Sequence, residues 1–85
     1  MKKTWKVYML ECSDGTLYTG VTNDIERRMR MHADGNGSKY VRARGFSRLL
    51  HVELAASKSD AMTREAKIKS MKRREKLLLF KGSSM

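Results

Sequence analysis

Five polar side chains are of types that could act together on a phosphate group: Tyr8, Tyr18, Arg28, His32 and Glu65. A tyrosine can help to deprotonate water, an arginine can clamp a phosphate, a histidine can assist proton transfer, and a glutamate can hold a divalent ion. Each of these residues also has an ordinary structural explanation. Whether they form one site depends on the strands and helices that carry them.

The two tyrosines lie in two apolar, strand-like runs, residues 5–12 and 16–21, on either side of a Ser-Asp-Gly turn signal. This pattern predicts a β-hairpin. Side chains alternate between the two faces of a strand, so the length of the loop decides where the tyrosines point. A two-residue loop would place Tyr8 and Tyr18 on opposite faces, where each is only a packing aromatic.

A three-residue loop with Gly15 in a left-handed bulge gives a different register. Leu10 then lies opposite Tyr18, and Tyr8 lies opposite Gly20. Both tyrosines share one face as diagonal neighbours, with open space beside Tyr8. We predict the three-residue loop.

The first helix is predicted to begin at Asn23, because Asn23 can cap it and Glu26 follows at the capping-box spacing. At 100° per residue, Ile25, Met29 and His32 fall on one stripe. Arg28 lies at the edge of this stripe, one turn before His32. The structural alternative is an arginine that extends over the edge of the core and a histidine within it.

The remaining elements are predicted at residues 39–46 (a single helical turn), 48–55 (a third strand), from Ser57 or Ser59 to about Met71 (a helix) and 72–81 (a basic helix). In the third strand, Leu50, Val52 and Leu54 share one face, with His51 and Glu53 on the other. The order strand, strand, helix, strand, helix, helix indicates an α+β fold with helices on a mainly antiparallel three-stranded sheet. Residues 1–81 form one domain, and 82–85 are a frayed tail.

Glu65 is the most informative single position. On its helix, the apolar arc consists of Ala61, Met62, Ala66 and Ile68, and Glu65 projects near the middle of this arc, with Lys69 also inside it. A carboxylate on a buried face is costly unless it is paired or bound to a metal. The structural alternative is a Glu65–Lys69 pair at i,i+4, which is common and weak.

The charge balance predicts a polyanionic partner. The chain has 19 Lys and Arg against 9 Asp and Glu, a net charge of +10 over 85 residues, and such a field favours nucleic acid. The candidates for its contacts are Lys39, Tyr40, Arg42, Arg44 and Lys69. Residues 39–46 interleave charge with aromatic rings, which suits backbone contacts and base stacking. A basic surface turn anchored by its aromatic residues explains this segment equally well.

The single cysteine, Cys12, cannot form an internal disulfide, which fits a reducing cytoplasm. The sequence has no signal-peptide pattern and no apolar run long enough to span a membrane. Cys12 and the two histidines lack zinc-ligand spacing. We therefore expect a cytoplasmic domain without a zinc site.

The triplet KVY at 6–8, followed by YTG at 18–20 and then by Arg28, His32 and Glu65, resembles the GIY-YIG nuclease superfamily. The resemblance runs from residue 5 to about residue 78. It includes the stretches HADGNGSKYVRARG (32–45) and REAKIKSMKR (64–73), which are typical of the small, single-domain, largely uncharacterised bacterial branch. Val21 stands where the repair-nuclease members carry a lysine, and no asparagine follows Asn36, although several members use a late one.

The resemblance implies a metal-dependent endonuclease that hydrolyses phosphodiester bonds. In that family pattern, Tyr8 and Tyr18 position and deprotonate the attacking water, although the resemblance does not assign the base to either one. Arg28 binds the scissile phosphate, and His32 supports proton transfer. Glu65 holds one Mg²⁺ or Mn²⁺, hard cations that suit carboxylate and phosphate oxygens. We expect DNA rather than RNA as the substrate.

A second hypothesis is a nucleic-acid-binding or adaptor module that retains the nuclease fold without efficient catalysis. This module would bind with a steep dependence on salt and give no metal-dependent product. Its binding would depend on Lys39, Arg42 or Arg44 rather than on Glu65. A role at a membrane surface for the basic segment 67–81 ranks third.

Overall fold

The strands and helices form the predicted α+β fold. The computed structural model describes residues 4–83. Its elements are β1 (Lys6–Cys12), β2 (Leu17–Thr22), α1 (Ile25–Ala33), α2 (Lys39–Arg44), β3 (Phe46–Leu54), α3 (Lys58–Lys69) and α4 (Arg73–Ser83). The single turn predicted at 39–46 is a six-residue helix, α2, followed by its capping residue Gly45 and the first residue of β3. Among the described residues, no helix has the length and apolar character needed to cross a membrane.

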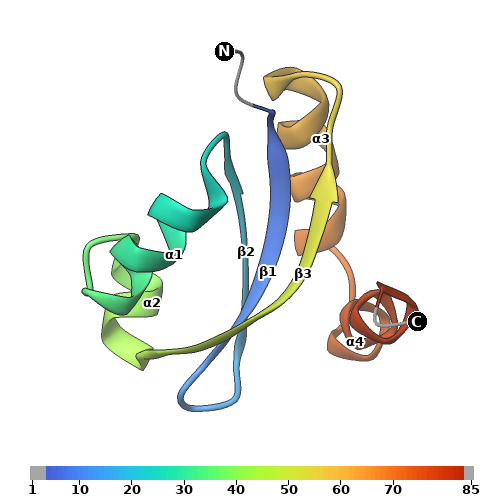
Figure 1. Ribbon diagram of the computed structural model, residues 1–85. Helices are drawn as coiled ribbons and strands as arrows, with labels where there is room; N and C mark the ends of the chain where they lie inside the picture. Colours follow the sequence, from blue (N-terminus) through green and yellow to red (C-terminus); the bar gives the residue numbers. More distant parts are fainter. Residues whose placement is uncertain (1–3, 84–85) are drawn as a thin grey trace.

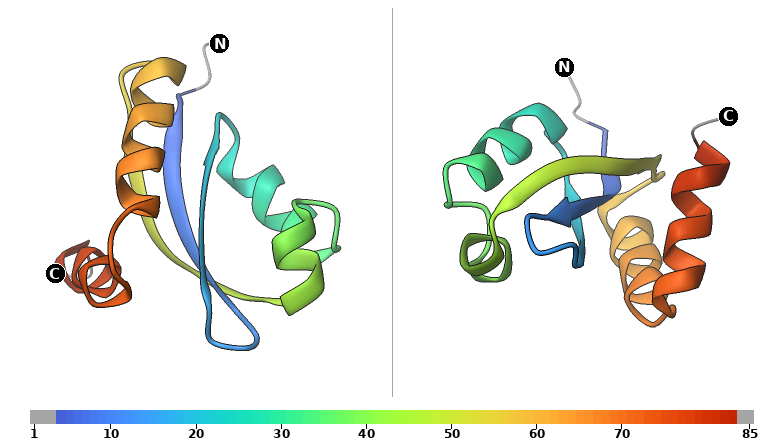
Figure 2. Two further views of the ribbon diagram at one scale, coloured as in Figure 1. Left: turned by 180° about the vertical axis from the view of Figure 1, so that it is seen from behind. Right: turned by 90° about the horizontal axis from the view of Figure 1, so that it is seen from below.

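The sheet has the order β2-β1-β3, and both strand pairs are antiparallel. The central strand β1 is buried on both faces, since Val7, Tyr8, Met9 and Leu10 are each no more than 1% exposed. This explains why KVYMLEC is almost continuously apolar rather than alternating. Helices α1 and α2 lie on one side of the sheet, and α3 and α4 lie on the other (Figures 1 and 2).

Each side of the sheet has its own hydrophobic cluster. The first is built on Tyr8, Leu10, Cys12 and Val41, with Tyr18, Ile25, Met29, Phe46 and Leu49 packed against it. The second is built on Val7, Ala61 and Ile68, with Trp5, Val21, Ala55, Met71 and Leu79 packed against it. The alternation of β1 therefore directs Tyr8 to the side of α1, and Val7 to the side of α3.

The hairpin has the predicted three-residue loop. Gly15 has φ 86°, in the left-handed region, and its N–H donates to the carbonyl of Cys12 at 2.9 Å. Leu10 pairs with Tyr18, and Tyr8 pairs with Gly20. The two tyrosines consequently lie on the same face of the sheet.

Helix α1 begins one residue later than predicted. Asp24, not Asn23, is the capping residue, and its side chain accepts a hydrogen bond from the N–H of Arg27 at 3.2 Å. Thr22 fixes this choice, because its hydroxyl accepts from the Asp24 N–H at 3.0 Å and donates to the Asp24 carbonyl at 3.2 Å. A short Thr-Asp turn therefore overrides the capping-box spacing of Asn23 and Glu26.

A bulge in β3 changes which of its side chains are buried. The β1–β3 register shifts near Leu50, so Leu49 is the residue that pairs with Leu10 and joins its cluster. Leu50 is buried, but Val52 and Leu54 are 38% and 74% exposed. The predicted apolar face is therefore buried only at Leu50, whereas Val52 and Leu54, opposite Tyr8 and Lys6 on an edge strand, are exposed.

The last two helices are close to their predicted limits. Ser57 caps α3, accepting a hydrogen bond from the N–H of Asp60 at 3.1 Å, which resolves the choice between Ser57 and Ser59. The helix ends at Lys69 rather than near Met71. Helix α4 continues to Ser83, so it includes the first two residues of the predicted tail, and residues 84–85 lie outside the described chain.

Candidate active site

One cleft contains four of the five predicted catalytic and metal-binding residues. Its volume is about 350 Å³, and Tyr8, Tyr18, Arg28 and Glu65 line it. These residues come from β1, β2, α1 and α3 in turn. Helices α1 and α3 lie on opposite sides of the sheet (Figure 1). Arg28 from α1 and Glu65 from α3 nevertheless both line this cleft. The fifth residue, His32, lies directly behind Tyr8.

Tyr8 and His32 form a buried pair. The Tyr8 hydroxyl oxygen lies 2.8 Å from Nε2 of His32, and the two residues are 1% and 2% exposed. Burial raises the pKa of the Tyr8 hydroxyl well above its usual value, and Tyr18 adds to this effect, although Arg28 opposes it. Tyr8 is therefore a neutral hydroxyl near pH 7.

His32 is the acceptor that suits this hydroxyl. Burial lowers the pKa of the imidazole below its usual 6.5, and the positive charge of Arg28 lowers it further. A neutral imidazole can accept the Tyr8 proton at Nε2. Among the described residues, the buried Nδ1 of His32 has no hydrogen-bond partner. Gly37 covers that edge of the ring, and a Cβ there would overlap the imidazole.

The aromatic rings form a continuous cluster that ends at the surface. The ring centroids of Tyr8 and Tyr18 are 6.3 Å apart, and those of Tyr18 and His32 are 5.5 Å apart. Tyr40 of α2 extends the cluster, at 5.6 Å from Tyr18. Tyr18 is partly exposed, unlike Tyr8. The cluster therefore holds both tyrosines in fixed orientations with one of them open to solvent.

Gly20 makes room for Tyr8. It lies opposite Tyr8 in the hairpin, and a Cβ at Gly20 would overlap the Tyr8 hydroxyl and ring. The open space predicted beside Tyr8 is thus filled by the tyrosine itself, which lies across the glycine. Tyr8 can therefore take this position only because residue 20 is a glycine.

Glu65 reaches the cleft from the rim of α3. Its side chain is 21% exposed, and its Oε2 lies 3.6 Å from Nζ of Lys69, so the predicted i,i+4 pair is present. Ala61 and Ile68 are buried, but Met62 is 53% exposed and Ala66 is also exposed. The buried arc is narrower than predicted, and Glu65 lies beside it rather than at its middle.

The cleft fits one hard divalent ion. Glu65 contributes the single carboxylate among the described residues that line it, and the described part of the chain contains no group of three His, Cys, Asp or Glu that could hold a metal. An ion held by one carboxylate must take its other ligands from water and from the phosphate oxygens of a substrate. Mg²⁺ and Mn²⁺ bind in this way.

An ion-pair network fixes α3 against the sheet. Arg64, the neighbour of Glu65, donates to both carboxylate oxygens of Glu53 on β3, at 2.7 and 2.9 Å. Glu53 also lies 2.7 Å from Nε2 of His51. The hydrogen bonds from Arg64 are the largest reason that the pKa of Glu53 falls to about 2. This bidentate contact holds the turn of α3 that carries Glu65.

The predicted nucleic-acid contacts divide into two groups. Lys39 and Arg42 are exposed and line a hollow of about 250 Å³ beside α2. Arg44 is already engaged: its guanidinium lies 4.2 Å from the centroid of Tyr40 and 3.5 Å from a carboxylate oxygen of Asp14. Lys69 is half exposed and contacts Glu65. The lysine and arginine at the hollow are therefore better placed for a phosphate backbone than Arg44.

Three residues that were not predicted also line the cleft: Trp5, Lys58 and Met62. Met62 belongs to the predicted apolar arc around Glu65, but nothing in the local pattern of Trp5 or Lys58 marked them, because they meet only when the first turn of α3 packs beside the start of β1. Val21 lines the same cleft. Lys58 thus supplies a further cation to the cleft.

A comparison with protein families supports the resemblance in the sequence. The model of the GIY-YIG catalytic domain matches residues 4–77. A UPF0213 protein of Halobacterium salinarum is 51% identical over 74 residues, which cover 87% of this chain and 96% of the relative. One of Oceanobacillus iheyensis is 49% identical over 74 residues, covering 87% of this chain and 86% of the relative.

A solved structure is also similar. The solution NMR structure of a UPF0213 protein from Bacillus halodurans matches with a TM-score of 0.56 and 46% sequence identity. The match covers 89% of this chain and 81% of that one. The α+β fold described above is therefore also found in a solved relative.

Proposed function

Because the chain belongs to the GIY-YIG catalytic domain family, we propose that it is a metal-dependent endonuclease that hydrolyses phosphodiester bonds in DNA. The observation that carries this proposal is the convergence of Arg28 and Glu65 on one cleft with Tyr8 and Tyr18. A phosphate-binding cation, a metal-binding carboxylate and two hydroxyl groups are the parts that such a hydrolysis needs. The net charge of +10 supports a polyanionic substrate.

The buried Tyr8–His32 pair supports a proposal for the proton transfer. Water attacks phosphorus and gives its proton to the Tyr8 oxygen, while the Tyr8 hydroxyl proton passes to Nε2 of His32, 2.8 Å away. The phosphorus–oxygen bond to the leaving strand breaks, and that oxygen takes a proton from solvent. Tyr8 does not need to ionise beforehand, which suits its raised pKa. Tyr18, which is partly exposed, orients the water.

Arg28 and Glu65 act on the phosphate. The guanidinium of Arg28 binds the non-bridging oxygens and offsets the charge that develops on them. A divalent ion held by Glu65 would add positive charge at the same oxygens. When the ion binds, the half-exposed side chain of Lys69 either moves away from Glu65 or stays at the rim of the cleft as a further cation.

The test is a panel of labelled DNA and RNA oligonucleotides in single-stranded, duplex, nicked, flap and branched forms, incubated with and without Mg²⁺ or Mn²⁺. We expect a product that requires the ion, appears with DNA and is lost when EDTA is added. Cleavage that persists in EDTA, or a preference for RNA, would contradict the corresponding part of the proposal.

One observation favours the second hypothesis, a binding module without efficient cleavage. The Glu65–Lys69 contact at 3.6 Å occupies the carboxylate that the ion would need. In that case every substrate of the panel would remain intact while binding weakened steeply with salt. Substitution of Lys39 or Arg42 would then reduce affinity, whereas substitution of Glu65 would not.

A further inference from the structure

The cleft has a second wall that the proposed reaction leaves without a role. Tyr8, Tyr18, Arg28 and Glu65 account for the chemistry at the phosphate. The indole of Trp5, at the start of β1, and the side chains of Lys58 and Met62 on α3 complete the lining beside them. The indole and the thioether have no suitable function in the hydrolysis, since they neither bind a hard ion nor move a proton near pH 7, and the proposed reaction does not use Lys58.

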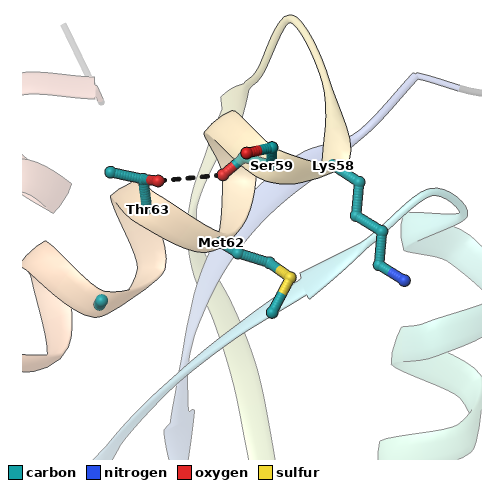
Figure 3. Close-up of a pocket in the computed structure, with 5 residues that line it drawn as sticks. Lys58, Ser59, Met62 and Thr63 are labelled. Carbon is teal, nitrogen blue, oxygen red and sulfur yellow. Dashed lines mark hydrogen bonds between the residues drawn. The ribbon is translucent and has the colours of Figure 1, made fainter.

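These three side chains converge from two elements. Lys58 Nζ lies 5.5 Å from the centroid of the Trp5 ring. Met62 follows Lys58 by one helical turn, so both extend from the same side of α3 (Figure 3). Trp5 is only partly buried, and Met62 is 53% exposed. The result is an aromatic ring and a thioether beside an ammonium group, open to solvent.

A larger hollow continues from this wall along α3. Its volume is about 850 Å³, and it shares Lys58 and Met62 with the cleft before it passes Ser59 and Thr63. The Thr63 hydroxyl donates to the Ser59 carbonyl at 3.1 Å, so its proton is already used within the helix (Figure 3). A chain that leaves the cleft therefore has an open path over a mainly apolar surface.

Building on the proposed nuclease function, we propose that Trp5, Lys58 and Met62 form a subsite for the unpaired base of a nucleotide next to the scissile phosphate. The base stacks on the indole ring of Trp5, with the thioether of Met62 on its other side. The ammonium group of Lys58 contacts the following phosphate. Charge complementarity favours a nucleotide over an apolar peptide, because the wall carries a cation and the chain has a net charge of +10. Bases in an intact duplex are already stacked on both faces, so the subsite selects single strands, flaps and frayed ends.

Trp5 is the only tryptophan in the chain, and its emission therefore reports on this wall alone. The unmodified protein is titrated in EDTA with a short single-stranded DNA and with a strand of equal length made of abasic residues. Both strands carry the same phosphate charge. In parallel samples, the anisotropy of a labelled strand measures binding directly.

We expect both strands to bind, and only the base-bearing strand to quench the emission of Trp5 strongly. Equal emission changes with the two strands, or binding without any change, would overturn the subsite and leave the proposed nuclease function standing. Absence of an anisotropy change with either strand would also overturn the subsite, whereas the proposed nuclease function is decided separately by the cleavage panel with Mg²⁺ or Mn²⁺.

Substitutions provide an independent measurement. Trp5→Ala should weaken binding of the base-bearing strand by about tenfold, the effect of losing one stacked base, and leave the abasic strand within about twofold. Met62→Ala should act in the same direction more weakly, and it is safe for folding because Met62 is exposed. Leu78→Ala, at a residue of α4 that is 59% exposed, is the matched control. Equal weakening of both strands by Trp5→Ala and Met62→Ala would contradict the subsite.

Discussion

The hydroxyl of Tyr8 and Nε2 of His32, 2.8 Å apart, join the central strand to α1 in the interior of the protein, behind the cleft. The hydrogen bond lies between a neutral phenol and a neutral imidazole, because burial moves both pKa values toward the uncharged forms. The contact gives Tyr8 a proton acceptor without exposing that acceptor to solvent.

Tyr8→Phe should reduce cleavage by about 10²-fold or more, the usual effect of losing a positioned acid–base group. It should also lower the free energy of unfolding by about 1–2 kcal/mol, because the buried Nε2 of His32 loses its partner. Single-turnover cleavage and urea unfolding measure the two effects. Tyr18→Phe is the comparison, since its hydroxyl belongs to a partly exposed residue and its loss should cost less stability. A Tyr8→Phe protein that cleaves like the wild type would contradict the proton-transfer assignment.

The pH dependence of cleavage should show an acidic limb that belongs to His32. The pKa of this imidazole lies below 6.5, so it is neutral and able to accept a proton above that value. As the pH falls through its lowered pKa, His32 becomes protonated and the rate should decline. His32→Gln should lower the plateau and remove this limb, which a pH series of single-turnover rates would detect. An unchanged limb in the variant would assign it to another group.

Gly20→Ala should damage both the fold and the activity. The added Cβ overlaps the Tyr8 hydroxyl and ring, so Tyr8 must move away from His32. We expect a loss of about 1–3 kcal/mol in the free energy of unfolding together with a large loss of cleavage. Gly15→Ala is the matched control, since nothing lies within 4 Å of a Cβ there and only its positive φ causes strain. Gly15→Ala should reduce stability but leave cleavage by the folded protein unchanged. An equal loss of cleavage in Gly15→Ala and Gly20→Ala would contradict this explanation.

Glu53→Gln should make the protein less stable near pH 7, by about 2 kcal/mol after allowance for solvent screening. The pKa of Glu53 is depressed from 4.5 to about 2. Its stabilising effect is therefore present above pH 4.5 and is lost as the pH falls through about 2. Urea unfolding over this range should show a gap between wild type and variant that closes in acid. A gap of the same size at all pH values would mean that the carboxylate charge is not responsible.

Lys39→Gln and Arg42→Gln should each weaken DNA binding and reduce its salt dependence. A lost phosphate contact lowers the slope of log affinity against log salt by about 0.7 for single strands and about 0.9 for duplex. Arg44→Gln should have a smaller effect, because Arg44 is already engaged with Tyr40 and Asp14. Anisotropy titrations at several salt concentrations measure the slopes. A larger change from Arg44→Gln than from the other two variants would contradict this ranking.

Local patterns predicted the fold because its decisive features are local. The Ser-Asp-Gly turn sets the hairpin register, and the register places Tyr8 opposite Gly20. Where two local signals competed, the sequence was not sufficient: Asn23 and Asp24 are adjacent candidate caps, and the Thr22 hydroxyl selects the second. Leu54 is exposed on a strand at the edge of the sheet, and alternation along one strand does not reveal which strand lies at the edge.

The site was predictable where a residue type is distinctive and unpredictable where only packing brings residues together. Arg28 stood out as a charge beside an apolar stripe and Glu65 as a charge predicted near the middle of one, although the buried arc is narrower than its sequence pattern and Glu65 lies beside it. Trp5 and Lys58 are more than 50 positions apart, and no periodicity connects them. Only the packing of α3 beside the start of β1 places them on one wall.

The most direct test of the central claim is single-turnover cleavage of one labelled DNA substrate over a range of Mn²⁺ concentrations, with wild type, Glu65→Gln and Glu26→Gln prepared side by side. Glu26 is an exposed glutamate of α1 and serves as the matched control. We predict Mn²⁺-dependent product from wild type and Glu26→Gln, no product above background from Glu65→Gln, and DNA affinities within about twofold among the three. Equal cleavage by Glu65→Gln and wild type would identify a contaminating nuclease and contradict the assignment of this cleft as an active site.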